Sequence, residues 1–430
     1  MKKIILLRIS VLCMLLLAAC SKSHQDNPTD SSIKIEILSG NNQTDSIGVT
    51  LKDSVTIKVS KAGKPLPNYF LQFHILGCDD DLLSERQLNS AGIGVFSWRL
   101  TGVIGKQSLK VVLLDNNRKK IDSITAIANT IKNSRGYVRS ACTPNANPLL
   151  LSKISTGRLL ALFADVPFIY YSDDNAVTWH KLVSSVSFKS PYRLVSSPAN
   201  ELFLLDNSSL YYSGDMGKTW TIRNPLNAAS GITAITYAPS GKLITVTANT
   251  DDKQIQISTD KGLNWTPIGS GYPHHNYIQV NEDKSGDLVF LGDAGYIVVN
   301  HGALWHELNP TLTYRMTGMT TDDKGNLYIG RLGSTYNTDL LKSGDSGTTY
   351  NVINSGPYLD ASMTQQSDGN IYIWQITNGI MKLSASNTLV RVTPPGLQAS
   401  GVYVLAGNGS LVFGDNSAIA PKSTLVYTLP

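Results

Sequence analysis

The chain has 430 residues, of which 42% are hydrophobic and 16% are charged, with a formal net charge of +5. This composition excludes a disordered or collagen-like chain, and the length predicts more than one domain. Lys2, Lys3 and Arg8 supply three of the five excess charges, so the rest of the chain is nearly neutral, which argues against a nucleic-acid partner.

Residues 1–19 have the pattern of an export signal, with a basic start and an apolar run over Ile9–Ala19 that is too short to span a bilayer. Leu17–Cys20 resembles the lipobox of bacterial lipoproteins. The resemblance implies cleavage before Cys20, which then carries a lipid anchor, and Ser21 favours the outer membrane of a Gram-negative bacterium. An ordinary secretory signal with an incidental cysteine is the alternative.

The mature chain begins with a flexible, polar tether over residues 20–32. If Cys13 leaves with the signal and Cys20 carries the lipid, only Cys78 and Cys142 remain. A disulfide between them would join two domains, but we expect two buried free thiols. No Cys/His spacing is typical of zinc, so we predict neither a metal nor another cofactor.

Residues 33–131 are predicted to form a small β-sandwich, since short alternating strands are separated by regular Gly, Asn and Pro turns. The segments Lys64–Phe73 and Ala91–Trp98 resemble the bacterial Ig-like domains of invasin-type surface proteins. That resemblance implies that Gly92 ends a hairpin, that Trp98 points inward and that the domain is a spacer. The expected strands are Ile33–Leu38, Ser54–Val59, Tyr69–Ile75, Gly94–Arg99, Ser108–Leu114 and Ser123–Ala128.

A turn motif that ends in an aromatic residue recurs through residues 133–430, and its best copy is Tyr211–Trp220. The aromatic positions are Trp179, Trp220, Trp265, Trp305 and Tyr350, at spacings of 41, 45, 40 and 45 residues. A period of about 40–50 residues built from strands predicts the blades of a β-propeller.

The motif resembles the Asp-box, or BNR repeat, S-x-D-x-G-x-T-W, which occurs in sialidases, in sortilin-type receptors and in propellers of other kinds. An Asp in such a turn can accept hydrogen bonds from backbone N–H groups, so we interpret these positions as structural. They are Asp174, Asp215, Asp260, Asn300 and Asp345. A sixth copy, Ser384–Val390, is degenerate.

A second pattern, a turn followed by an apolar strand, occurs seven times and predicts an all-β chain with a seven-bladed propeller; six blades are the alternative. These strands are Gly157–Leu162, Asn200–Leu205, Gly241–Val246, Gly286–Leu291, Gly325–Gly330, Gly369–Trp374 and Gly409–Gly414. The last unit stops after its third strand, so we expect Gly136–Ser140 to supply the missing outer strand and close the ring.

Resemblance to the family places ligands on the face away from the Asp-box turns. Tyr, Arg and His in the loops of that face suit a carbohydrate or an anionic group. The candidates are Tyr192, Arg193, Tyr272, His275, Tyr314, Arg315, Arg331, Tyr336 and Tyr358. The pairs Tyr192–Arg193 and Tyr314–Arg315 could instead only cover blade edges. His274 and His275 should point apart, which argues against a metal pair.

A sialidase needs an arginine triad, a Tyr–Glu pair and an acid Asp. The nearest match to the family's Arg-Ile-Pro signature is Tyr192–Val195, which lacks the Pro, and residues 133–430 hold only Glu201, Glu282 and Glu307. No catalytic residue is therefore assigned. We predict a surface-anchored lipoprotein that binds a glycan or a surface protein. The alternatives are an exo-acting glycoside hydrolase of sialidase type and an assembly factor.

Overall fold

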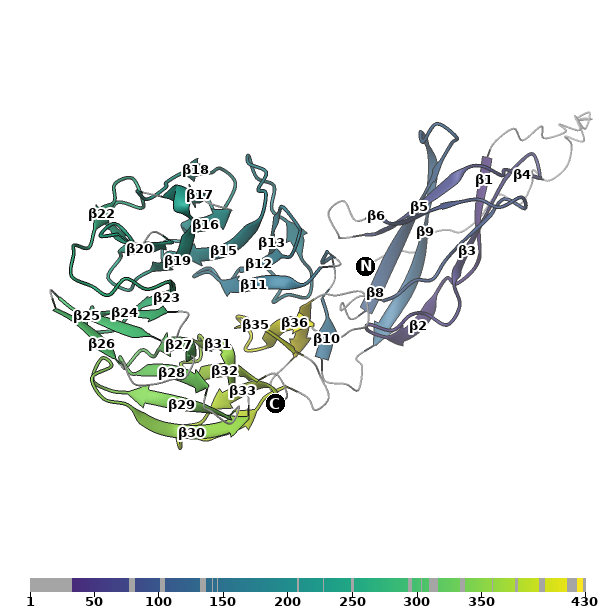
Figure 1. The fold of residues 1–430 in the computed structure, drawn as a ribbon. Coiled ribbons are helices and arrows are strands. Elements are labelled where there is room, and N and C mark those ends of the chain that lie inside the picture. Colours follow the sequence, from purple (N-terminus) through teal and green to yellow (C-terminus); the bar gives the residue numbers. More distant parts are fainter. Residues whose placement is uncertain are drawn as a thin grey trace, which may run out of the picture.

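The structure is a computed structural model, and it describes residues 33–427 with internal gaps (Figure 1). The gaps are 77–81, 101–104, 132–136, 141, 145, 207–208, 227, 249–250, 293–295, 303, 309–315, 333–336, 358, 376–377, 394–398 and 416–423. The described residues form strands and one short 3-10 helix, Ala228–Ser230, without an α-helix. None of their helical segments could cross a membrane. The predicted signal, tether and Cys20 lie outside the described residues.

The N-terminal part consists of two sheets. One holds β1 (Ile33–Ser39), β3 (Val55–Lys61), β4 (Lys64–Pro65) and β7 (Ile93–Phe96), with β3 at its centre. The other has the order β2 (Gln43–Ser46), β9 (Lys120–Ile131), β8 (Gly105–Leu114), β5 (Phe70–Ile75) and β6 (Leu82–Gln87). All its pairs are antiparallel except β2 with β9.

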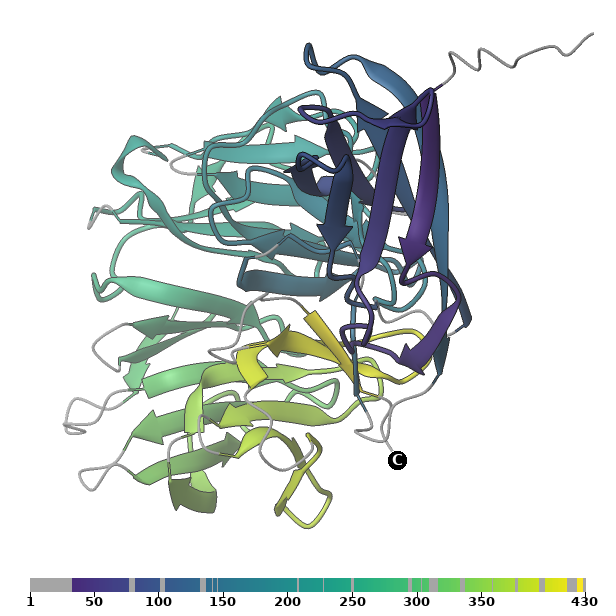
Figure 2. The same ribbon diagram turned by 90° about the vertical axis from the view of Figure 1, so that its right-hand side faces the viewer.

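The two sheets enclose a single core, because alternate residues of β3 and β1 face those of β5, β8 and β9. Trp98 and Phe73 are fully buried there, and Gly92 takes a positive φ of 69° at the hairpin, as the sequence predicted. The six expected strands are present, whereas β2, β4 and β6 were missed. Figure 2 shows these long, twisted strands beside the second part of the molecule.

The second part contains, within the described residues, seven four-stranded antiparallel sheets arranged around an axis as a β-propeller (Figure 1). The first sheet holds β11 (Pro148–Lys153), β12 (Leu159–Phe163), β13 (Ile169–Ser172) and β14 (His180–Lys181). The second holds β15 (Pro191–Ser196), β16 (Leu202–Asp206), β17 (Ser209–Ser213) and β18 (Thr221–Ile222). The third holds β19 (Ile232–Tyr237), β20 (Leu243–Thr247), β21 (Ile255–Ser258) and β22 (Thr266–Pro267).

The other four sheets repeat this arrangement. The fourth holds β23 (Tyr277–Glu282), β24 (Leu288–Gly292), β25 (Ile297–His301) and β26 (Leu304–Leu308). The fifth holds β27 (Met316–Thr321), β28 (Leu327–Leu332), β29 (Asn337–Ser343) and β30 (Asn351–Pro357). The sixth holds β31 (Leu359–Gln365), β32 (Ile371–Gln375), β33 (Gly379–Leu383) and β34 (Leu389–Arg391). The seventh holds β35 (Ala399–Leu405), β36 (Leu411–Asp415) and β37 (Thr424–Tyr427).

The seventh sheet takes its outer strand from the start of the second part. β10 (Tyr137–Arg139) pairs antiparallel with β37, in the segment where the sequence predicted a closing strand. The indole N–H of Trp179 in the first sheet donates to Thr424 Oγ1, which in turn donates to Ser140 Oγ, at 3.0 and 2.7 Å. The two ends of the ring are therefore joined by paired strands and by a buried series of hydrogen bonds between side chains.

Each turn between the first and second strands has the same backbone conformation. Six carry Gly at positive φ, and the seventh carries Asn200 at φ 62°. Asn tolerates this left-handed region, which explains why the pattern survives without Gly. All seven expected second strands are present and begin two residues later than predicted, because the Gly or Asn belongs to the turn.

Four turns between the third and fourth strands share one hydrogen-bond scheme, and we call them the Ser–Asp turns. In the second sheet, the Ser213 hydroxyl donates to Asp215 and accepts from the Gly217 N–H, while Asp215 accepts from the Thr219 N–H and hydroxyl. The equivalent turns begin at Ser172, Ser258 and Ser343. Asp174, Asp260 and Asp345 thus have the structural role that the sequence predicted.

Asn300 does not belong to a turn of this kind, which corrects the prediction. β25 and β26 stay paired up to His301 and Leu304, so the connection is a tight hairpin with Gly302 at φ 63°. Asn300 is buried within the strand pair, opposite Trp305. In the degenerate sixth copy, Ser384 Oγ still accepts from the Thr388 N–H, and the hydroxyls of Ser384, Ser386 and Thr388 bond to one another.

Cys142 forms a disulfide, which corrects our expectation of a free thiol. It follows β10 closely and has a positive φ of 61°. Its partner sulphur lies outside the described residues.

Candidate functional site

Four of the nine predicted ligand-binding residues, Tyr314, Arg315, Tyr336 and Tyr358, lie outside the described residues. The other five lie in three separate sheets or their connections. They are described in chain order below.

Tyr192 and Arg193 lie near the start of β15, the innermost strand of the second sheet. The Tyr192 hydroxyl donates to the Ile232 carbonyl of the third sheet at 2.8 Å, so this side chain links two neighbouring sheets. Arg193 forms no ion pair or hydrogen bond with the described residues, and burial lowers the pKa of its guanidinium, against the opposing effect of Tyr192. Of the pair, Arg193 therefore keeps the donors that an anionic group would require.

Tyr272 is a core residue, which corrects the prediction of a ligand contact. It is 3% exposed, its ring lies 5.0 Å from that of Trp305, and its hydroxyl donates to the Asp251 carbonyl at 3.0 Å. Burial raises its pKa. This side chain fills the interface between the third and fourth sheets.

His275 lies in a small surface cluster with Tyr296 and Glu307. Its ring is stacked on Tyr296 at 3.9 Å, and its Nε2 is 3.1 Å from a Glu307 oxygen. His274 instead approaches Asp252 at 3.7 Å. The two histidines thus have different partners, as the sequence predicted for adjacent residues of an extended segment.

Arg331, near the end of β28, forms an ion pair with Asp339 of β29. Its Nη2 is 2.5 Å from one Asp339 oxygen, and the other oxygen accepts from the Ser355 hydroxyl. The pKa of Asp339 is lowered: burial raises it, but the bonds from Ser355 and Arg331 outweigh that effect. Arg193, His275 and Arg331 thus lie in β15, in the connection before β23 and in β28 respectively, in three different places in the propeller.

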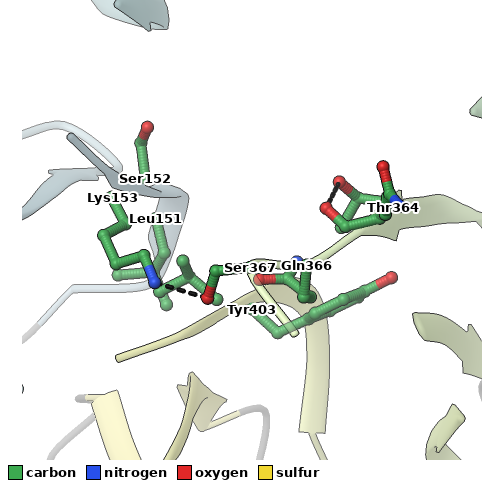
Figure 3. A pocket seen from close by; sticks show the side chains of 9 residues that line it. Leu151, Ser152, Lys153, Thr364, Gln366, Ser367 and Tyr403 are labelled. Carbon is green, nitrogen blue, oxygen red and sulfur yellow. Dashed lines mark hydrogen bonds between the residues drawn. The ribbon is translucent and has the colours of Figure 1, made fainter. Parts of the chain in front are cut away.

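The structure instead contains a cavity of about 300 Å³ near the axis, which we call the axial cavity (Figure 3). The ends of β11 and β31 and the turn after β31 supply its polar lining, and β35 contributes Tyr403 and Val404. The polar residues are Ser152, Lys153, Thr364, Gln365, Gln366 and Ser367.

A hydrogen bond between the first and sixth sheets places this cavity at the centre of the ring. Lys153 Nζ donates to Ser367 Oγ at 2.5 Å (Figure 3). Both sheets are neighbours of the seventh sheet, because Leu151 packs against Val404 and Tyr372 against Tyr403. The two side chains can therefore meet only where the inner strands converge on the axis.

The axial cavity opens on the face that carries the Ser–Asp turns. β31 and β33 both run antiparallel to β32, so the ends at Gln365 and Leu383 lie on the same side of the sheet. The turn after Gln365 lines the cavity, and the turn after Leu383 is the degenerate copy of the repeated motif. The described cavity thus lies on the opposite side to the loops that the family resemblance indicated.

The lining of the axial cavity suits a neutral or acidic polar ligand. Burial lowers the pKa of Lys153, while the charge of Asp368 opposes this change. The Lys153 ammonium donates one hydrogen bond to Ser367 and makes no ion pair with the described residues. Its other N–H groups remain donors. The Tyr403 hydroxyl donates to the Ser362 and Tyr372 carbonyls, so this residue is held in place by the protein itself.

The described lining holds no Asp, Glu, His or Cys. Its described lining therefore offers no carboxylate nucleophile. Sequence reasoning overlooked Lys153 and Ser367 because they are 214 positions apart and carry no shared motif. In the sequence, they differ from their surroundings only as polar residues at or just after the end of an inner strand, and several other inner strands also end in polar residues.

The three glutamates of the propeller are each bound by neighbouring groups. Glu201 accepts from Ser197, from Tyr212 at 3.0 Å and from Lys261. Burial raises its pKa, but these bonds outweigh that effect and the net shift is downward.

Glu282 accepts from the N–H and hydroxyl of Ser240 in the preceding sheet. Glu307 pairs with His275. These carboxylates therefore stabilise contacts between or within sheets.

Comparison with known proteins supports the propeller fold. A family model described as the DUF6242 β-propeller domain matches residues 160–306, about a third of the chain. The comparison with curated proteins gave no match.

Several solved structures have a similar fold at low sequence identity. A virginiamycin B lyase from Staphylococcus aureus, in an inactive form with quinupristin, has 14% identity and a TM-score of 0.54 over 68% of this chain and 98% of its own. YCF48 from Cyanidioschyzon merolae has 12% identity and a TM-score of 0.50 over 68% and 98%.

The extracellular domain of a protein described as a one-component system from B. thetaiotaomicron has 12% identity and a TM-score of 0.53. That match covers 89% of this chain and 53% of the other. At this identity, the three likenesses show the fold alone.

Proposed function

We propose that this chain is a lipid-anchored envelope protein whose propeller binds a glycan in the axial cavity without altering it chemically. The observation that carries the proposal is the cavity lining, whose described residues supply one ammonium bonded to a hydroxyl, several hydroxyls and amides, and no carboxylate. Hydroxyl and amide groups match the hydrogen-bonding needs of a sugar, and the ammonium suits a carboxylated one.

The proposed layout follows the sequence. Residues 1–19 are the signal, Cys20 is the lipid site, 20–32 are the tether, 33–131 are an Ig-like spacer and 133–430 are a seven-bladed Asp-box propeller. The two-sheet core around Trp98, the repeated Ser–Asp turns and the closing strand β10 support this layout. Outer-membrane attachment rests on Cys20 and Ser21 alone.

The test is a glycan array followed by calorimetric titration, with a soluble form of the chain that begins at Ser21. We expect saturable binding of at least one glycan. Lys153→Gln should weaken binding of acidic sugars at least tenfold, because a charge-assisted hydrogen bond contributes about 1.5–3 kcal/mol. Lys218→Ala is the matched control, since this lysine lies in a Ser–Asp turn on the same face.

Absence of binding across the array would reject the glycan and leave a protein ligand, for which a pull-down from envelope fractions is the measurement. If the Lys153→Gln variant binds the glycan as tightly as the native chain, the binding site lies outside the axial cavity. The names of the similar structures differ widely, so the shared fold does not choose between a glycan and a protein.

A glycosidase of sialidase type is the second candidate, because Tyr212 and Glu201 form the kind of Tyr–Glu pair that such an enzyme needs. Glu201 of this pair also forms an ion pair with Lys261. The pKa of Tyr212 is raised, mainly by burial and next by the hydrogen bond to Glu201. Both features suit a structural contact better than a nucleophile. Hydrolysis of fluorogenic glycosides that disappears in Tyr212→Phe would support the enzyme over the binding protein.

A further inference from the structure

A pair of histidines lies on the outer edge of the fourth sheet, away from the axial cavity. In the hairpin of β25 and β26, Val299 lies opposite His306 and His301 lies opposite Leu304. Opposite residues share a face of the sheet, and so do residues two apart along a strand. His301 and His306 are therefore diagonal neighbours on one face.

The two imidazoles line a cavity of about 130 Å³ between the fourth and fifth sheets, which we call the histidine pocket. Its walls are Val299, His301, His306, Gly347 and Thr348. Gly347 and Thr348 belong to the Ser–Asp turn of the fifth sheet, and the Thr348 hydroxyl donates to the Asp345 carbonyl. The pocket thus has space in front of both rings.

One carboxylate fixes the orientation of His301. Asp287, in the turn before β24, lies 2.7 Å from His301 Nδ1. A carboxylate accepts a hydrogen bond, so Nδ1 carries the proton, and in the neutral imidazole Nε2 has a lone pair for a metal ion. Histidines that bind metals usually donate the other ring N–H to a carboxylate in this way.

The spacing of the two rings also fits a shared ion. Two imidazoles bound to one tetrahedral ion, at nitrogen–metal lengths of about 2 Å, have ring centroids roughly 5–5.5 Å apart. The centroids of His301 and His306 are 5.5 Å apart, with an angle of 63° between the ring planes. The separation of the two rings is therefore compatible with a shared ion.

We propose that His301 and His306 bind a divalent transition-metal ion, with Asp287 as the outer carboxylate that orients His301. Imidazole ligands suit Cu²⁺, Ni²⁺ and Zn²⁺, and affinity should be highest for Cu²⁺. The described residues contain no group of three or more metal-ligating side chains, so they supply two ligands to this site. The remaining coordination positions face the pocket and are open to water or to a ligating group of a partner molecule.

The experiment is calorimetric titration of the full mature chain, without a histidine tag, with CuCl2 and ZnCl2, and with MgCl2 as the negative control. We expect saturable binding of one Cu²⁺ per chain, weaker binding of Zn²⁺ and none of Mg²⁺. His306→Gln should lower the Cu²⁺ affinity at least tenfold. Asp287→Asn should lower it about 10–100-fold, as for other outer-shell partners.

His274→Gln is the matched control and should leave the affinity unchanged, since His274 lies in a different loop beside Asp252. Electron paramagnetic resonance of the Cu²⁺ complex should show two nitrogen ligands in the native chain and one in His306→Gln. His306 is exposed, so this variant should fold, and its circular dichroism spectrum checks that. Failure to bind Cu²⁺, or equal binding by the native chain and His306→Gln, would overturn the proposal.

Discussion

At the scale of single residues, the Ser–Asp turn shows why one side chain is repeated at four positions. Ser213 is 1% exposed, and its hydroxyl both donates to Asp215 and accepts from the buried Gly217 N–H. A hydroxyl is the smallest group that can do both. The repeated letters of the motif therefore satisfy backbone groups of a turn, and chemistry must be sought elsewhere.

Replacing Ser213 with Ala should destabilise the propeller by about 1–3 kcal/mol, because the Gly217 N–H loses its buried acceptor. Chemical denaturation of the two proteins measures the difference. Ser384→Ala is the control: this serine lies in the degenerate turn, where it bonds to exposed hydroxyls and accepts from the exposed Thr388 N–H, so its removal should cost less. Equal losses in both variants would contradict the role given to Ser213.

Acid should weaken the same turns at a defined pH. Hydrogen bonds lower the pKa values of Asp215, Asp260 and Asp345 from 3.8 to about 2, led by the Thr219 N–H for Asp215, the Asn264 N–H for Asp260 and the Ser343 hydroxyl for Asp345. A carboxyl group whose pKa is lower in the folded than in the unfolded protein stabilises the fold. This stabilisation is complete above the unfolded-state pKa and is lost as the pH falls through the folded-state pKa.

The stability advantage of the native chain over Asp215→Asn should therefore be constant above about pH 5 and shrink between pH 4 and pH 2. Melting temperatures of both proteins across that range measure it. An advantage that persists undiminished at pH 2 would show that charge is not what Asp215 contributes.

Individual surface residues were harder to predict than the turns. Tyr272, chosen as a ligand contact, is buried against Trp305, a residue 33 positions further along the chain. Arg331 is paired with Asp339 across a hairpin. The sequence shows that a loop contains Tyr or Arg, but it does not show which neighbouring sheet covers that loop.

At the scale of elements, the second strands were predictable because a short, largely buried and mainly apolar strand follows a turn signal each time. The outer strands β14, β18 and β22 have two residues each and leave no such pattern. Asn200 illustrates how one element bonds to the next: its Oδ1 accepts from the N–H and hydroxyl of Ser155 in the first sheet, at 2.9 and 2.7 Å. This residue thus combines a turn conformation with a bond between sheets.

Two substitutions at Asn200 separate these contributions. Asn200→Gly keeps the positive φ and loses only the bonds to Ser155, whereas Asn200→Ala loses both. We expect Ala to be less stable than Gly by about 1 kcal/mol, since left-handed backbone costs roughly 1–2 kcal/mol for residues with a Cβ. Urea unfolding of the two variants measures this, and a more stable Ala variant would contradict the conformational argument.

At the scale of the whole molecule, the architecture was predictable and the axial cavity was not. A repeat period and a missing outer strand were enough to predict a closed ring with β10 beside β37. The cavity, by contrast, combines the ends of β11 and β31 with β35, and only closure of the ring brings them together. Closure is a property of the complete chain, so no local pattern marks Lys153 as a binding residue.

The disulfide of Cys142 bears on how the two parts of the molecule are joined. The sequence leaves three partners: Cys13 in the predicted signal, Cys20 at the predicted lipid site and Cys78 in the sandwich. If the signal is removed and Cys20 carries a lipid, as we propose, only Cys78 is left, so we predict a bond to Cys78. A crosslink between positions 78 and 142 would constrain the unfolded chain by about 4 kcal/mol in the chain-entropy model.

Peptide mapping without reductant should yield one crosslinked peptide that contains Cys78 and Cys142 and disappears on reduction. Cys142→Ser should lower the melting temperature and speed protease cleavage between the two parts, because the peptide linker then becomes their only covalent connection. Cys78→Ser should reproduce both effects, and the double variant should add nothing further. A crosslinked peptide that contains Cys20 would contradict both the pairing and the lipid anchor.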